Sequence, residues 1–267
     1  MMPHGTSCAL VSNISDPDRA SSRLSTLTRA QAFTLALFLF FVPAHAQKRK
    51  RARTLPAGGR VAVVVDERLA ALRDAPELSA NLLQRLSRGR FVSVAGERSS
   101  SDGVTFYRVA VTRRTSGWIQ ADAVVRPSRA GDDERLLRLV RGSEEFDRIS
   151  RARIFLDAFP RSPLRPAVLL VFGDAAEEAA AKLAREAQRR LDAREIEAGG
   201  APVASYFLNF NGLDRYNRSG VKFVFDPAHK QLHYDGAAWR EILRRFPQSP
   251  EAAEARARLE ANTALSK

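Results

Sequence analysis

The sequence predicts a multidomain protein in which a small all-β barrel precedes an α-helical region of solenoid-like hairpins. In residues 60–127, short β-branched and alternating runs are separated by polar turns, which is typical of a small barrel. In residues 132–264, apolar side chains instead recur at helical spacing. A repeated Phe-Pro-x-Ser-Pro motif in this second part predicts helices that stop and restart. The 267 residues are enough for two such domains.

Residues 1–46 have the order of a secretory signal peptide. Arg23 and Arg29 precede the apolar run 32–42, and Ala44-His45-Ala46 supplies small residues at a cleavage position. We therefore expect export to the periplasm or the exterior, with cleavage after Ala46. A buried helix or a membrane anchor is the alternative, although 11 residues are too few to cross a bilayer.

Much of the net charge of +13 is concentrated behind this predicted signal peptide. Residues 47–59 form a basic linker with Pro and Gly and no acidic residue, and its cations are Lys48, Arg49, Lys50, Arg51 and Arg53. Like charges at this density repel and keep a segment extended, suited to weak contact with an anionic surface. A solubilising tail is the alternative. The charge of the later regions is mixed, so we expect no specific nucleic acid partner.

Five short strands are expected in residues 60–127. Each is a run of β-branched or aromatic residues, and polar segments such as 99–103 supply turns between them. The expected strands are 61–65, 91–94, 105–111, 117–119 and 121–125. Strands this short and numerous predict a barrel.

The residue order in this region resembles that of a bacterial SH3 (SH3b) domain. The elements that carry the resemblance are Leu72-Arg73-Asp74-Ala75-Pro76, Gly89, Tyr107-Arg108-Val109 and Gly117-Trp118-Ile119. The resemblance covers about residues 60–127, but the Ser-rich loop at 96–103 is longer than in the short form of the family. It implies an SH3-like barrel that binds a ligand without catalysis, because exported SH3b domains commonly attach to peptidoglycan or peptides.

Three residues of this region are candidate ligand contacts. Tyr107 and Trp118 offer flat apolar surfaces with a polar tip, and Arg73 offers a guanidinium for a carboxylate of a stem peptide. The alternatives are that Trp118 is a core residue and that Arg73 is an ordinary surface charge.

The second region contains an internal repeat. Phe159-Pro160-Arg161-Ser162-Pro163 recurs as Phe246-Pro247-Gln248-Ser249-Pro250. Proline disfavours continuation of the preceding helix, while each serine suits an N-cap and the proline after it suits a first helical turn. A helix, this motif and an Ala-rich helix resemble the tetratricopeptide-like (TPR-like) repeats of bacterial envelope proteins, which implies a surface that docks a protein partner. The Trp-Leu-Gly-Tyr signature of the standard repeat is absent.

An irregular insert is expected near residues 196–234, between the two copies of the motif. A long helix over 175–194 precedes it, and a further helix is expected over 206–216. The segment 221–234 alternates at first, so we expect an extended excursion or a short hairpin there.

The motifs that carry catalysis are missing from the sequence. The single cysteine, Cys8, lies before the predicted cleavage site, and no phosphate-binding loop or nucleophile elbow is present. His229 and His233 could share a metal with Asp226 or Asp235, but a Pro and a Gly within this segment favour a loop. We therefore expect no catalytic residues, no cofactor and no metal.

Together these observations predict an exported, non-enzymatic binding or scaffold protein of the cell envelope. The SH3b-like region is expected to bind peptidoglycan or a peptide, and the helical repeats are expected to dock a protein partner. The alternative is an accessory subunit or activator of a cell-wall hydrolase, because SH3b modules often accompany such enzymes.

Overall fold

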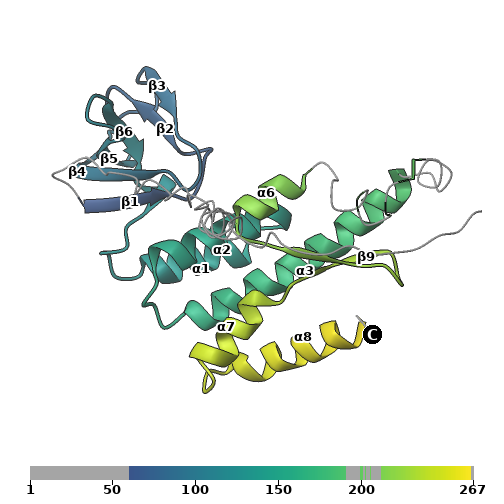
Figure 1. Cartoon of the computed structure of the whole chain (residues 1–267). Coiled ribbons are helices and arrows are strands. Elements are labelled where there is room, and N and C mark those ends of the chain that lie inside the picture. The colour runs from purple at the N-terminus through teal and green to yellow at the C-terminus, as the bar shows by residue number, and fades with distance from the viewer. Residues whose placement is uncertain (1–59, 191–198, 201, 203–204, 206–211, 266–267) are drawn as a thin grey trace, which may run out of the picture. The chain divides into compact units, whose positions relative to one another are not determined.

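The computed structural model describes residues 60–190, 199–200, 202, 205 and 212–265 (Figure 1). These residues all belong to one compact unit. The predicted signal peptide, residues 1–46, and the basic linker, residues 47–59, lie outside the described residues. Within the described part, no helix is both long and apolar enough to cross a membrane.

The first part of the chain forms one antiparallel sheet of seven strands. The strands are β1 (Arg60–Val64), β2 (Ala71–Arg73), β3 (Leu82–Arg85), β4 (Phe91–Ser99), β5 (Thr105–Ala110), β6 (Ser116–Gln120) and β7 (Val124–Val125), with a 3₁₀ turn η1 (Ala121–Ala123) before β7. Their order is β3-β2-β6-β5-β4-β1-β7. Because β3 and β7 each have a single neighbour, the sheet is open.

Alternate residues of these strands build the core on the inner face of the sheet. Val92, Val109 and Ile119 are fully buried, and Leu72 packs with them. Successive side chains of a strand point to opposite faces, so the residues between these positions point outward. Burying one such aliphatic side chain stabilises the fold by about 1.5–3 kcal/mol, which makes this face the main source of stability for the sheet.

Helices and one hairpin form the second part of the chain. They are α1 (Asp132–Arg141), α2 (Glu145–Ala158), α3 (Arg165–Arg190), α6 (Leu213–Arg218), β8 (Phe223–Asp226), β9 (Gln231–Tyr234), α7 (Ala237–Arg245) and α8 (Glu251–Leu265). Strands β8 and β9 form a separate two-stranded antiparallel sheet. The expectation of a short hairpin within 221–234 is therefore confirmed.

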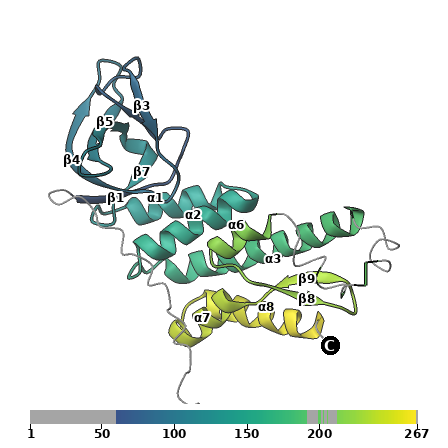
Figure 2. The same ribbon diagram turned by 45° about the horizontal axis from the view of Figure 1, so that its top comes forward.

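Helix α3 is the central element of the helical part. It packs against α1, α2, α7, α8 and β9, and it runs beside the hairpin in both views (Figure 1, Figure 2). Its buried face is rich in alanine, at Ala175, Ala176, Ala179, Ala180, Ala184 and Ala187. Small side chains at these positions let neighbouring elements approach the helix closely.

The closest approach to α3 is made by a tryptophan of α7. A Cβ atom at Gly173 would lie 2.3 Å from Nε1 of Trp239, so only glycine leaves room for the indole ring. Trp239 is buried, and its ring meets the ring of Tyr234 edge to face at 5.4 Å between centroids. Gly173 therefore determines where α7 and β9 meet α3.

Both copies of the Phe-Pro-x-Ser-Pro motif end a helix as predicted. The N–H of Phe159 donates to the carbonyl of Phe155 over 2.8 Å, and α2 ends at the preceding residue. The N–H of Phe246 donates to the carbonyl of Ile242 over 2.7 Å, and α7 ends in the same way. Helix α3 begins two residues after Pro163, and α8 begins directly after Pro250.

A buried arginine joins the sheet to the helices. The Nε of Arg151 on α2 donates to the carbonyl of Val65 over 3.3 Å, and its Nη1 donates to Oγ of Ser143 over 2.5 Å. Its Nη2 lies 3.6 Å from Oδ2 of Asp66. At the rim of the junction, Arg88 forms two hydrogen bonds to the carboxylate of Asp147, at 2.6 and 3.0 Å.

Burial and neighbouring charges shift the pKa of Asp66 in opposite directions. Burial alone raises the pKa of the carboxyl, but hydrogen bonds from the side chain and backbone of Arg68, and the charges of Arg68 and Arg151, outweigh it. The pKa of Asp66 is therefore lower than its ordinary value. The hydrogen bond from Arg88 likewise lowers the pKa of Asp147. Both carboxylates stay ionised against their arginines at neutral pH.

The predicted combination of a small SH3-like barrel and a TPR-like helical solenoid is wrong. The sheet has seven strands rather than five, because 71–73 and 82–85 also form strands, and β3 lies at an open edge instead of closing a barrel. The helices do not stack as successive hairpins. They pack around the Ala-rich α3, and the strand β9 packs on the same helix.

The change from strands to helices falls between Val125 and Asp132. The apolar core nevertheless crosses this point, because Val63, Val65 and Val125 of the sheet region share a cluster with Leu136 of α1. The domain boundaries drawn from the sequence stay a prediction.

We predict that Gly173→Ala destabilises the protein by about 1–3 kcal/mol, the usual cost of overpacking a core. The added methyl group must push the indole of Trp239 away from α3. Urea unfolding followed by circular dichroism measures the loss. The matched control is Gly142→Ala, since a Cβ there meets its nearest neighbour at 3.4 Å; equal stability of the two variants would contradict the packing described.

We predict that stability falls as the pH drops below about 4. The pKa of Asp147 is lower in the folded state than its ordinary value of 3.8. The stabilisation from this carboxylate is therefore complete above that ordinary value and is lost as the pH falls through the folded pKa. Between pH 7 and pH 2.5, the urea concentration at the unfolding midpoint should fall less for Asp147→Asn than for the wild type. The exposed-turn control Asp102→Asn should keep the full drop, and an unchanged drop in Asp147→Asn contradicts the pairing with Arg88.

Candidate functional site

A row of side chains crosses the outer face of the sheet at right angles to the strands. In the strand register Leu82 of β3 lies opposite Arg73 of β2, and Arg73 lies opposite Trp118 of β6. Trp118 in turn lies opposite Arg108 of β5, which faces Gly96 of β4. Directly opposed residues of neighbouring strands project from the same face, so these residues form one continuous row. We call it the outer row.

The outer row depends on a close contact between β2 and β6. A Cβ atom at Gly117 would lie 2.6 Å from the carbonyl oxygen of Arg73, so a side chain at this position would separate the two strands. The register of β2 and β3 shifts between Leu72 and Arg73: Leu72 pairs with Gln84 and Arg73 with Leu82, so Leu83 is the extra residue of a bulge.

The centre of the outer row is an aromatic ring surrounded by cations. The guanidinium of Arg98, two residues beyond Gly96 on β4, lies 5.7 Å from the ring centroid of Trp118, within cation–π range. Arg98 and Arg108 are exposed, and Trp118 is half-buried. Arg73 is also half-buried, and its Nη1 donates to the carbonyl of Ala80 over 2.6 Å, which holds its position.

One end of the outer row is apolar and exposed. The described residues include four large hydrophobic side chains that are exposed, and three of them belong to β3 or the turn before it: Leu78, Leu82 and Leu83. Leu82 and Leu83 are 48% and 52% exposed. All four residues of β3 are exposed, and no strand of the described part pairs with the outer edge of β3. An extended ligand could therefore meet leucines at β3 and arginines further along.

Of the three candidate residues named from the sequence, two come together and one does not. Arg73 and Trp118 are neighbours on the outer face. Tyr107 belongs to the inner core and is 2% exposed. Its hydroxyl accepts a hydrogen bond from Nη1 of Arg129 over 2.9 Å, and the guanidinium of Arg126 lies 4.7 Å from its ring centroid. The structure thus places Tyr107 away from any outer-face ligand.

Sequence reasoning missed the other members of the outer row. Arg108 alternates with the inward Tyr107 and Val109, and this alternation was a signal that could have placed it on the outer face. Arg98 and Leu83 carried no such signal, because their positions follow from bulges in β4 and in the β2–β3 pair. Three arginines, an indole ring and leucines on one face can bind an anionic, partly apolar chain.

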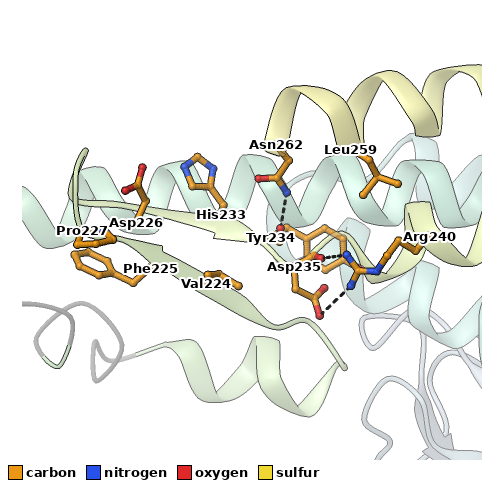
Figure 3. A pocket seen from close by; sticks show the side chains of 10 residues that line it. All are labelled: Val224, Phe225, Asp226, Pro227, His233, Tyr234, Asp235, Arg240, Leu259 and Asn262. Atoms are coloured by element: carbon orange, nitrogen blue, oxygen red, sulfur yellow. Dashed lines mark hydrogen bonds and ion pairs between the residues drawn. The ribbon is translucent and has the colours of Figure 1, made fainter. Parts of the chain in front are cut away.

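A hollow lies beside hairpin β8–β9, away from the outer row, and Figure 3 shows its lining. Its volume is about 400 Å³, and it is lined by Val224, Phe225, Asp226, Pro227, His233, Tyr234, Asp235, Arg240, Leu259 and Asn262. Several of its polar groups already bond to each other: Nδ2 of Asn262 donates to the carbonyl of Tyr234 over 2.7 Å, and Nη1 of Arg240 donates to the carbonyl of Asp235 over 2.5 Å. Burial raises the pKa of Tyr234 to about 12, so its hydroxyl stays neutral.

The two histidines near this hollow bind different carboxylates. Nδ1 of His229 lies 2.6 Å from Oδ2 of Asp226, and this hydrogen bond lowers the pKa of Asp226. Nδ1 of His233 lies 2.8 Å from Oε1 of Glu177 on α3, and the other oxygen of Glu177 accepts the N–H of Tyr234 over 2.7 Å. Among the described side chains, no three metal-ligating groups converge. Here His233 ties the hairpin to α3.

Comparison with known proteins finds no match for this chain. No protein-family model fits it, and neither the curated proteins nor the solved structures contain a match. The resemblances to SH3b domains and to TPR-like repeats therefore stay predictions from the sequence.

We predict that anions reach Trp118 more readily than cations do, because three arginines surround it. The chain has two tryptophans, so Trp239→Phe leaves Trp118 as the sole fluorophore of that type. Iodide should quench this variant much more strongly than caesium. The matched control is Trp118→Phe, whose buried Trp239 should resist both quenchers. Equal quenching of Trp118 by the two ions contradicts the cationic surroundings described.

Proposed function

We propose that this chain is a non-enzymatic binding protein of the cell envelope. It holds an extended, carboxylate-bearing ligand across the outer row, and this ligand is a peptide or the peptide stem of peptidoglycan. Its helical part docks a protein partner. The observation that carries the proposal is the alignment of Arg73, Trp118 and Arg108 in one register across three strands.

The spacing of the outer row suits a ligand with two separated negative charges. Arg73 and Arg108 stand on strands two spacings apart, which is about 10 Å at the backbone. Trp118 lies between them and can contact a flat or aliphatic part of the ligand. The exposed guanidinium of Arg108 can form paired hydrogen bonds with one carboxylate. Arg73 can offer its remaining Nη2 to the other end of such a segment, because its Nη1 is bonded to Ala80 and its Nε is buried.

The apolar end of the outer row favours a peptide over a bare polyanion. Leu82 and Leu83 beside Arg73 can contact alkyl side chains, which a phosphate or sulfate polymer lacks. Peptide stems of wall polymer combine alkyl groups with free carboxylates. The envelope location rests on the predicted signal peptide, residues 1–46.

Co-sedimentation of the full chain with purified peptidoglycan sacculi tests the proposal. We predict that Arg108→Gln weakens retention about tenfold, because a hydrogen bond to a charged group is lost. Trp118→Ala should weaken it to a similar extent, about tenfold, because the apolar contact of the indole ring is lost. Sacculi whose carboxylates have been converted to amides should retain the wild-type chain as poorly as unmodified sacculi retain these two variants. Amidation also removes the attraction of the basic linker, residues 47–59, for the wall. The outer-row variants keep this linker, so their loss of retention separates recognition by the outer row from general adhesion.

The matched control is Arg113→Gln, which removes an exposed arginine in the turn between β5 and β6, away from the outer row. It should bind as the wild type does. Retention that is equal for wild type and Trp118→Ala, or unaffected by amidation, would overturn the wall-ligand proposal. Circular dichroism of each variant verifies that the fold is intact.

A further inference from the structure

The side chain of Arg98 covers the indole ring of Trp118, and only a weak contact keeps it there. Its guanidinium lies 5.7 Å from the ring centroid. Arg98 is exposed, and no carboxylate of the described residues pairs with it. A cation–π contact at an exposed site favours the covered arrangement over open ones by a factor of only about two to five. A ligand can therefore move this arginine at little cost.

The outer face beside this contact is open above Gly96. Gly96 lies directly opposite Arg108, and a Cβ atom added to Gly96 would meet only the Cβ atom of Arg108, at 3.9 Å. Arg98 follows two residues later on β4, and Trp118 is the other neighbour of Arg108. These three side chains border the position above Gly96, which we call the Gly96 subsite.

Arg98 and Arg108 can share one anion at the Gly96 subsite. They are diagonal neighbours on β4 and β5, since Arg108 faces Gly96 and Arg98 lies two residues further along. Diagonal positions are about 7–8 Å apart at the backbone, within reach of long side chains. Neither guanidinium pairs with a carboxylate of the described residues. Arg73, by contrast, already donates to the carbonyl of Ala80. The end of the outer row at β4 and β5 therefore offers more free donors to an anion.

We propose that Arg98 is the specificity-determining residue of the outer row. A carboxylate that enters the Gly96 subsite draws Arg98 from the indole to a position beside Arg108, and the uncovered ring of Trp118 takes the apolar group next to that carboxylate. The favoured ligand is a chain whose free carboxylate adjoins an alkyl or flat group, as in the C-terminal residue of a peptide. This inference rests on the proposed function and deepens it.

The cover discriminates by charge because moving it is repaid only by an anion. An uncharged ligand must displace Arg98 from Trp118 and gives nothing in return, whereas a carboxylate forms charge-assisted hydrogen bonds with the displaced guanidinium. Specificity then comes from a penalty on the wrong ligand as well as from attraction of the right one. Removing Arg98 should therefore weaken binding of carboxylates and strengthen binding of uncharged ligands. A merely structural role would change both in the same direction.

A quenching measurement tests the cover without any ligand. In the Trp239→Phe background, Trp118 is the single tryptophan, and neutral acrylamide reports how accessible its ring is. Arg98→Ala should raise the quenching constant about twofold, as expected when a contact of this strength is lost. The matched control is Arg113→Ala, in the exposed turn between β5 and β6, which should leave quenching unchanged. Equal quenching with and without Arg98 contradicts the cover.

Retention by native and amidated sacculi tests the discrimination. Each variant is compared with the wild type on the same sacculi, so the contribution of the basic linker cancels. We predict that Arg98→Ala weakens retention by native sacculi about fivefold, because a hydrogen bond to a charged group is lost. On amidated sacculi the same variant should be retained about twofold more strongly than the wild type, because the ring is already uncovered.

Two further variants isolate the role of Arg98. Arg108→Gln should weaken retention by native sacculi without strengthening it on amidated sacculi, since Arg108 does not cover the ring. Arg98→Lys keeps a cation that can both cover Trp118 and pair with a carboxylate, so it should restore most of the preference for native sacculi. Circular dichroism verifies that each variant is folded.

The outcomes separate this inference from the wall-ligand proposal. If retention by native sacculi needs Trp118, but Arg98→Ala shifts retention by both kinds of sacculi in the same direction or by neither, the role of Arg98 is overturned and the wall-ligand proposal stands. Equal retention of wild type and Trp118→Ala by native sacculi overturns both, because the inference needs the same ligand.

Discussion

The guanidinium of Arg151 joins the two parts of the described structure. It binds the carbonyl of Val65, the hydroxyl of Ser143 and the carboxylate of Asp66, so one side chain connects the sheet, the α1–α2 turn and α2. A buried cation is costly unless its hydrogen bonds are satisfied and a carboxylate faces it. The cluster that Val63 and Val65 share with the helices excludes water around this interaction. The sheet and the helices are therefore joined by a shared apolar cluster and by the contacts of Arg151.

The helices contact one edge of the sheet, so the opposite edge is open to a ligand. Strands β1 and β7 lie next to the helices, whereas the outer edge of β3, at the opposite end of the strand order, is paired with no other described strand. The outer row begins at this edge, and its leucines are among the few large hydrophobic side chains exposed in the described residues.

The predictions that rested on local chemistry agree with the structure. The two helix stops lie at Phe159 and Phe246, because proline after each residue prevents the helix from continuing. The hairpin within 221–234 follows from alternation. The long helix expected over 175–194 begins ten residues earlier, at Arg165, because apolar residues from 168 onward continue the buried face. The prediction of a closed barrel was wrong, because closure of a sheet depends on which strand edges meet. Strands as short as 71–73 also carry little periodic signal in the sequence.

The sequence by itself determined the candidate residues Arg73 and Trp118, the alternation that puts Arg108 and Tyr107 on opposite faces of their strand, and the repeated corner motif. Only the tertiary structure decided that Tyr107 is a core residue, since the inner or outer direction of a side chain depends on which face of the sheet is covered. It also decided that Arg98 lies over Trp118, and that the hydroxyl of Ser162 has a hydrogen-bond partner whereas that of Ser249 meets none among the described residues. These facts depend on contacts between residues far apart in the chain, and local sequence patterns do not encode such contacts.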